Sequence, residues 1–338
     1  MATIKDIARE CGVSIATVSN VVNHTGRVSE KTVTRVMEAA DRMGYVPDRV
    51  ASNLKKRRTN VIGVITEDLT VFNTAEIVDG INEYLDDNGY SFLLGNLRLY
   101  KKYNNEFYKN DEYKDAAERE FRVMISQRVS GIIYIGAHVR EIDIVPEDCS
   151  VPVVVAYGFD KDRKIPSVVY DDELAAYEAV SSLIEGGAKK IGLITGEKKS
   201  LHTKLRAEGY KRALSEHGIK ENKKLIAAGN WQREGGRKAA EKLMKEGIDA
   251  IFSMSDTMSV GVYDYANKSG LKVGKDFRIV SFDNREISAE LTPALSSVAI
   301  PLSEIGKTAA ETMLGMLDGE NYEPESLKKL KCRIVKRD

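Results

Sequence analysis

Small polar side chains are concentrated in the stretch "VSIATVSNVVN", residues 13–23 of this 338-residue chain. Hydroxyl and carboxamide groups of this kind bond phosphate oxygens, and such contacts fix the register of a protein on a duplex without reading its sequence. The chemistry expected of this stretch is therefore contact with a polyanion rather than the making or breaking of bonds. The residues that we assign to phosphate contact are Thr3, Ser14, Thr17, Ser19 and Asn23.

Three residues of the same stretch have side chains that could read base edges. The carboxamide of Asn20 donates and accepts at once, as a paired contact with adenine requires. Ile15 and Ala16 suit apolar contact with thymine methyl groups. The alternative interpretation is a plain packing helix that reads nothing, and the neighbouring elements must decide between the two.

Two short helices joined by a glycine turn would position these side chains. Thr3 and Asp6 have capping-box spacing at the start of the first helix, and Gly12 ends it. Ser14 can cap the second helix, whose predicted buried face consists of Val18, Val21 and Val22. That face leaves Ile15, Ala16 and Asn20 pointing away from the packed core.

A third helix is predicted to begin after Ser29 and to stop at Gly44. Two helices at a sharp angle backed by a third form a helix-turn-helix, whose second helix enters the major groove of DNA. The arrangement favours DNA reading over plain packing. The residues of the third helix that we expect to face inward are Thr32, Val33, Val36, Met37, Ala40 and Met43.

Charge is distributed unevenly along the chain. The whole sequence has 51 Lys and Arg against 51 Asp and Glu, but residues 1–60 hold 11 basic side chains against 6 acidic ones. A basic segment on a mildly acidic remainder is the electrostatic pattern of a polyanion-binding module. The three isolated cysteines and the lack of an apolar run long enough for a signal peptide or a membrane span predict a cytoplasmic protein with no membrane association.

Motifs for catalysis are scarce. "IGKT" at residues 305–308 ends like a phosphate loop, but Pro301 stands where that loop needs its first glycine. The sequence has no GxGxxG and no HExxH, and its four histidines are scattered. We therefore expect no enzyme, no catalytic residues, no cofactor and no metal site.

From residue 61 onward, short apolar runs alternate with amphipathic segments. This alternation predicts parallel sheets with helices on both faces, and the number of strands predicts two lobes. Ligands of such folds lie at the carboxyl ends of the strands, which places a ligand in the cleft between the lobes. The predicted strands are 61–66, 90–95, 131–135, 152–156, 167–170, 190–195, 225–229, 249–253 and 277–282.

The sequence resembles the LacI/GalR family of bacterial repressors. "TIKDIARECGVSIATVSNVVN" and "VSEKTVTRVMEAADRMGYVPDRVASNL" carry the resemblance in the head, and "KKIGLITG", "LRAEGYKRAL" and "VSFDN" carry it in the body. It implies a small all-α helix-turn-helix domain and an α/β core of two parallel-sheet lobes that is similar to periplasmic binding proteins. It also implies a homodimer on a near-palindromic operator, controlled by a small sugar-like effector.

The resemblance implies the following division of the chain. Residues 1–46 form the DNA-binding domain, 47–59 a hinge helix or linker, and 60–338 the ligand-binding and dimerisation core. Each lobe is discontinuous: we expect 60–158 with 292–320 in one, and 159–291 with 321–338 in the other. In the hinge, Leu54 and Lys55 match family positions that enter the minor groove.

The resemblance also implies ligand contacts. Arg206 and Asp283 match an arginine and an acid that bond the same ligand, and charged hydrogen bonds of this kind confer strong selectivity. Trp231, the single tryptophan, matches a stacking aromatic, with plain core or hinge packing as the alternative. The remaining expected ligand residues are Phe72, Asn73, Thr74, Tyr157 and Ser255.

Two features leave alternatives open. Residues 98–120, with five aromatic side chains among charges, form a longer loop than is usual in the family, and we interpret them as a lid, a partner surface or a solvated insertion. The overall resemblance also admits a catabolite-control-type regulator governed by a phosphocarrier protein. A solute-binding receptor without DNA function is a further alternative, which the basic head disfavours.

Overall fold

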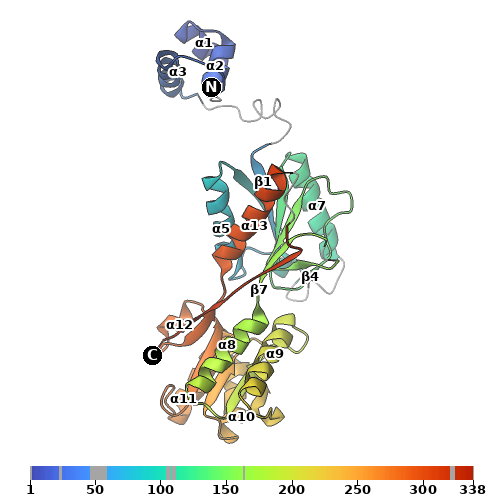
Figure 1. Ribbon diagram of the computed structural model, residues 1–338, viewed down its shortest axis with the longest axis vertical. Helices are drawn as coiled ribbons and strands as arrows, with labels where there is room; N and C mark the ends of the chain where they lie inside the picture. The colour runs from blue at the N-terminus through green and yellow to red at the C-terminus, as the bar shows by residue number, and fades with distance from the viewer. Residues whose placement is uncertain are drawn as a thin grey trace. The chain divides into compact units, whose positions relative to one another are not determined.

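The computed structural model describes residues 2–22, 25–45, 59–103, 107, 112–162, 164–319 and 324–337. The chain divides into two compact units, Met1–Thr59 and Asn60–Asp338. We call them the head and the core (Figure 1). Residues 46–58, which include most of the expected hinge with Leu54 and Lys55, lie outside the described residues, and so does Asn23.

The head packs three helices, α1 (Ile4–Cys11), α2 (Ile15–Val22) and α3 (Glu30–Arg42), around one small apolar cluster. The predicted capping box at the start of α1 is confirmed: the Thr3 and Asp6 side chains each bond the backbone N–H of the other. Gly12 ends α1 in the left-handed region at φ 58°, where a glycine has no Cβ to clash. The buried side chains are Ile7, Ala8, Cys11, Val18, Val21, Val36, Ala39 and Ala40.

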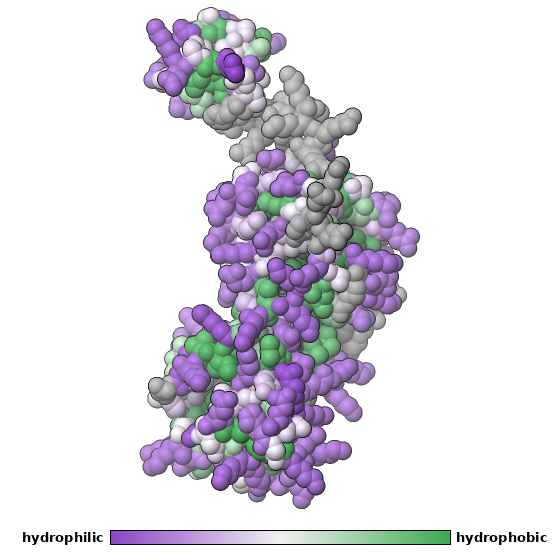
Figure 2. Space-filling model, viewed as in Figure 1, coloured by the Kyte–Doolittle hydropathy of each residue, from purple (hydrophilic) through white to green (hydrophobic). Residues whose placement is uncertain are grey.

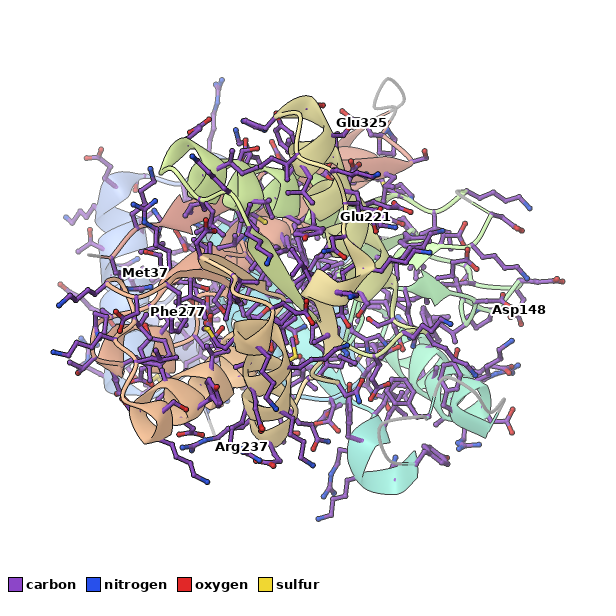
Figure 3. The ribbon with its side chains drawn as sticks, turned by 90° about the horizontal axis from the view of Figure 1, so that it is seen from below. Met37, Asp148, Glu221, Arg237, Phe277 and Glu325 are labelled. Carbon is purple, nitrogen blue, oxygen red and sulfur yellow. The ribbon has the colours of Figure 1, made fainter. Side chains whose placement is uncertain are left out.

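One prediction for the head is wrong. Met37, which Figure 3 labels on α3, is 37% exposed instead of facing inward, while Ala39 is fully buried. The apolar side chains of α3 span a wider arc than α1 and α2 can cover, so the helix turns its two small alanines toward them.

The first lobe of the core is built on a parallel sheet. Within the described residues its six strands follow the order β13-β7-β5-β3-β1-β2. The strands are β1 (Val61–Thr66), β2 (Ser91–Asn96), β3 (Gly131–Ile135), β5 (Val153–Ala156), β7 (Ser167–Tyr170) and β13 (Leu327–Leu330). Its helices are α5 (Thr74–Asp87), α6 (Leu99–Tyr103), α7 (Glu112–Ser126) and α13 (Leu302–Asp318), of which α5 and α13 lie side by side (Figure 1).

The second lobe has the same design. The described part of its sheet has six strands in the order β14-β12-β11-β10-β8-β9, all parallel except β14, which runs antiparallel to β12. The strands are β8 (Ile191–Thr195), β9 (Ile226–Ala228), β10 (Ala250–Ser253), β11 (Arg278–Asp283), β12 (Ser296–Ala299) and β14 (Arg333–Val335). The helices are α8 (Asp172–Glu185), α9 (Leu201–Glu216), α10 (Arg233–Lys245), α11 (Asp256–Ser269) and α12 (Ile287–Glu290), with a 3-10 turn at Lys223–Leu225.

A two-stranded ribbon, β4 (Glu141–Ile142) with β6 (Phe159–Asp160), stands beside the first sheet. Figure 2 shows mostly hydrophilic residues on the visible face of the core, as expected when each sheet buries its apolar side chains under helices. Among the described residues, no helix combines the length and the apolar character that a membrane span requires.

The lobe boundaries differ from those expected. The chain crosses between the lobes after β7, between β12 and α13, and between β13 and β14. Residues 159–162, residues 164–170 and β13 therefore belong to the first lobe, and β12 belongs to the second. The reason is pairing: β7 bonds β5 in parallel register, and a chain that completes this strand in the first sheet can leave the lobe only at Asp171.

Candidate functional site

The second helix of the head presents one buried and one exposed face. Val18 and Val21 are 0% and 3% exposed, and Val22 is half-buried. On the other face Ile15 is 51% exposed, and Ala16 and Asn20 are also exposed. The three side chains predicted to read bases thus share the outer surface of α2, outside the apolar cluster of the head. The Asn20 side-chain oxygen accepts a hydrogen bond from the Thr25 hydroxyl at 3.4 Å.

Hydroxyl side chains gather at the amino end of α2. Ser14 Oγ accepts a hydrogen bond from the Thr17 backbone N–H at 3.0 Å, which confirms its predicted capping role. The hydroxyl oxygens of Ser14 and Thr17 lie 2.8 Å apart. Thr3 is exposed and caps α1, and Ser19 is half-buried. Two helix amino ends therefore carry hydroxyl groups, and such ends attract anions through their unpaired N–H groups.

The core holds a cavity of about 660 Å³ between its two lobes. Every segment that lines it follows the carboxyl end of a strand, as in other open α/β sheets. Six of the eight predicted ligand residues line this cavity: Phe72, Tyr157, Arg206, Trp231, Ser255 and Asp283.

Asn73 and Thr74, the other two, do not line the cavity, and their role in ligand binding stays a prediction. Both side chains are 0% exposed, because the chain turns into α5 here and directs them inward while Phe72 stays at the surface. The Thr74 hydroxyl donates to the backbone oxygen of Asp68 at 2.9 Å. Thr74 therefore ties the start of α5 to the loop after β1, whereas the Asn73 side chain is buried and makes no capping bond.

Arg206 lies at the centre of a buried polar network. Its Nε donates to Asp172 Oδ1 at 2.7 Å, its NH2 donates to the Tyr170 hydroxyl at 2.9 Å, and its NH1 donates to the Met254 backbone oxygen. The Asp283 carboxylate lies 3.6 Å from NH1. These partners fix the guanidinium plane against the wall of the cavity, over the ring of Phe282.

Asp172 is a member of this network that the sequence did not reveal. Its other oxygen lies 2.7 Å from His202 Nδ1. Burial raises the pKa of the Asp172 carboxyl, but the attraction of His202 and Arg206 outweighs burial, so the pKa ends below its usual value. An acidic pair at the start of a helix, directly after a buried strand, was the available signal.

Three cavity residues have strained backbones. Tyr157, Trp231 and Asp283 adopt positive φ angles of 56°, 63° and 104°, a region that side chains other than glycine rarely occupy. Such strain persists only where the surroundings hold it, and it gathers at functional sites. Gly196 makes room for the tryptophan, since a Cβ there would lie 2.0 Å from the indole ring.

Asp283 gives the core a testable pH dependence. Burial raises the pKa of its carboxyl from the ordinary value of 3.8 to about 7, partly opposed by Arg206. Between these pH values the folded chain holds a proton that the unfolded chain releases. The contribution of this group to the free energy of unfolding therefore falls as pH rises through that window.

The Asp283→Asn variant should lack this loss of stability. Its free energy of unfolding should therefore rise relative to that of the wild type between pH 4 and pH 8. Urea unfolding at both pH values measures the difference. Subtracting the two proteins' unfolding free energies removes the contributions of groups that both share. One such group is His138: burial lowers its pKa from 6.5 to about 3, so its contribution to stability rises with pH between these values. Parallel pH profiles for the two proteins would contradict the assignment.

Comparison with known proteins gives consistent matches. The family described as bacterial regulatory proteins, lacI family, matches residues 3–48, and a periplasmic binding protein-like domain matches residues 180–338. Catabolite control protein A of Priestia megaterium is 35% identical over 337 residues, covering 98% of this chain and 97% of that protein. The transcriptional repressor PurR of Vibrio atlanticus is 30% identical, covering 96% and 94%.

Solved structures match over the same length. The structure of the Lac repressor dimer bound to operator and the anti-inducer ONPF has a TM-score of 0.79 and 27% identity, and it covers 99% of this chain and 98% of that chain. The transcription regulator CcpA of Lactococcus lactis has a TM-score of 0.66 and 30% identity, and it covers 83% and 98%. These relatives are regulators rather than enzymes.

Proposed function

The chain belongs to the lacI family of bacterial regulatory proteins, and from this premise we propose that it is a sequence-specific repressor of transcription. In this proposal two heads of a homodimer bind the halves of a near-palindromic operator, and a sugar-like effector bound between the lobes changes the affinity for DNA. Leu54 and Lys55 of the hinge and Asn23 of the head are kept as proposed DNA contacts. We assign the chain no catalytic role.

The observation that carries this proposal is the outer face of α2. Ile15, Ala16 and Asn20 are exposed together on a helix that Val18 and Val21 anchor by their burial. One exposed isoleucine is ordinary by itself, but here it shares a helix face with Asn20, so that one side chain can meet a thymine methyl while the other bonds adenine. Hydroxyl groups at the amino end of the same helix supply phosphate contacts.

The test is selection of palindromic duplexes from a random pool by the full chain, followed by titration of the selected site. Asn20→Ala removes one bidentate base contact from each half of the palindrome. It should weaken binding to that site roughly 30-fold or more, the equivalent of two contacts of about 1–3 kcal/mol each. Affinity for random duplex should hardly change, because phosphate contacts remain.

Met37→Ala, which truncates an exposed side chain on α3 rather than α2, is the control and should leave operator affinity unchanged. Equal losses on operator and random duplex in the Asn20 variant would remove this residue from base reading. Failure of the wild type to enrich any palindrome would refute the proposed function.

The cleft supports the effector part of the proposal. Arg206 and Asp283 offer a cation and a carboxyl group to hydroxyls, and Trp231 and Tyr157 add aromatic surface. Pockets of about this size, mostly apolar with a few fixed polar groups, are usual for small ligands. A ligand can shift DNA binding only by binding one arrangement of the lobes more tightly than the other.

A catabolite-control-type regulator governed by a phosphocarrier protein is the second candidate. The 35% identity to catabolite control protein A over 98% of the chain favours it. The two modes are separable with Asp283→Ala. An effect of a phosphocarrier protein on operator affinity should survive this substitution in the cleft, whereas an effect of a sugar should be lost.

A further inference from the structure

One wall of the cavity comes from the segment that follows β2. Tyr100 on α6 and Tyr113 on α7 line it, together with His138 and Arg140 from the loop after β3. Phe107 is 0% exposed and lies behind them, with its ring centroid 5.5 Å from Tyr100 and 5.6 Å from Tyr113. The described part of the long 98–120 segment is thus a packed wall rather than a solvated insertion.

The guanidinium of Arg140 is held inside this wall. It lies 5.4 Å from the Phe107 ring centroid and 5.6 Å from that of Tyr113, and it pairs with Glu67. Glu67 is 0% exposed and accepts two further hydrogen bonds, from the Tyr134 hydroxyl at 2.9 Å and the Ala137 N–H at 2.7 Å. Because these donors fix the Glu67 carboxylate, Glu67 in turn holds the Arg140 guanidinium in one position.

Both buried cations of the cavity are therefore balanced within the protein. Glu67 neutralises Arg140 in the first lobe, and Asp172 neutralises Arg206 in the second. The lining also has two exposed cationic side chains, Lys199 and Arg285, and two exposed carboxylates, Glu141 and Glu197, so these charges are equal in number. A cavity without excess positive charge gives little stabilisation to a phosphorylated ligand, which must give up its own hydration to enter.

We propose that Tyr100, Tyr113, His138 and Arg140 form a second subsite of the effector cleft, and that the cleft takes an uncharged two-ring carbohydrate. This inference rests on the proposed function, in which the cleft binds the effector. One ring lies against Arg206, Asp283 and Trp231, and the other lies against the tyrosine wall.

The chemistry of the second wall fits this ligand. A tyrosine hydroxyl donates and accepts, as each sugar hydroxyl does, so Tyr100 and Tyr113 can match either polarity. The Tyr100 hydroxyl lies 3.5 Å from His138 Nδ1, and burial keeps His138 uncharged at neutral pH. Aromatic rings also cover the apolar C–H face of a sugar, which burial removes from water.

Emission of Trp231 provides the assay, because it is the single tryptophan and it lines the cavity. The full chain is titrated with cellobiose, maltose and lactose, with glucose and galactose, and with glucose 6-phosphate. We expect at least one disaccharide to bind ten times more tightly than its constituent monosaccharides. Glucose 6-phosphate should not bind more tightly than glucose.

Tyr100→Ala should weaken the disaccharide at least tenfold and the monosaccharide less than twofold. Tyr103→Ala is the matched control: it removes a tyrosine from the same helix that does not line the cavity. Tyr100→Phe keeps the ring, and with it the packing against Phe107, and should weaken the disaccharide about threefold.

Three results would overturn the subsite. They are equal affinity for one ring and two, unchanged disaccharide affinity in both Tyr100 variants, or no binding of any sugar in the panel. Each leaves the proposed DNA-binding regulator standing if the chain still selects a palindrome, and the third also counts against a sugar-like effector. Loss of palindrome selection with intact, tyrosine-dependent disaccharide binding would instead refute the regulator and retain the subsite.

Discussion

Arg206→Met is expected to abolish the response to any cleft effector and to lower the free energy of unfolding by roughly 3–5 kcal/mol. The side chain is 3% exposed, and the Asp172 carboxylate lies 2.7 Å from it. Methionine fills similar space but leaves the ionised Asp172 carboxylate buried without its arginine counter-charge, whereas Asp283, with its raised pKa, can take up a proton. Urea unfolding followed by far-UV circular dichroism measures the stability, and operator titration with each sugar measures the response.

Two further variants isolate the cause. Arg206→Met combined with Asp172→Asn should recover a substantial part of the lost stability, because the uncompensated charge is gone, yet should still give no effector response. Arg212→Met removes another arginine of α9. Its side chain and that of its partner Glu173 are 38% and 34% exposed, so the substitution should lower the free energy of unfolding by about 1 kcal/mol or less. A double variant as unstable as the single one would show that charge is not the reason.

Leu94→Glu should lower operator affinity on the order of 100-fold without unfolding the core. Leu93 and Leu94 are 40% and 42% exposed on β2, the edge strand of the first sheet, and an apolar edge strand of this kind needs cover. We propose that a second copy of the chain provides it, as a dimer is the assembly of the matching Lac repressor structure. A glutamate in an apolar interface opposes association, and a single head then meets half of the operator alone.

Sedimentation and operator titration of the same samples test this prediction. Lys245→Glu changes the charge of a side chain that is 72% exposed on α10, and it should leave both measurements unchanged. A Leu94→Glu protein that sediments as a dimer, or a monomer that binds the operator as tightly as the wild type, would contradict the proposed interface.

Much of the core could be predicted from the sequence, because buried parallel strands are short and continuously apolar. The segments 61–66, 131–135 and 167–170 were predicted with the bounds that the structure has for β1, β3 and β7. The strands β12, β13 and β14 of the two sheets were not predicted: β12 reads "SSVA", β13 reads "LKKL", and β13 and β14 are partly exposed edge strands. These three strands lack a continuous apolar run, whereas the edge strand β2 has one, "FLL" at residues 92–94, and was predicted.

The candidate site, like the fold, could be predicted from the sequence only in part. The resemblance implied Arg206, Asp283 and Trp231, and the structure brings them into one cavity. Asp172, Glu67 and Arg140 were not predicted, because each depends on a partner distant in sequence. Glu67 and Arg140 stand 73 positions apart, and no local pattern joins them. Aromatic residues in 98–120 were noticed, but only the packing of Phe107 shows that this segment forms a wall of the cavity.

The two edge strands contributed by residues 327–335 have a consequence for synthesis of the protein. β13 completes the first sheet and β14 completes the second, so neither lobe has all its strands until the ribosome has passed residue 335. A released chain that ends after α13 would have two unpaired strand edges at once, on β7 and on β12. The core should therefore mature in one late step, and partial products should be frequent substrates of chaperones and proteases.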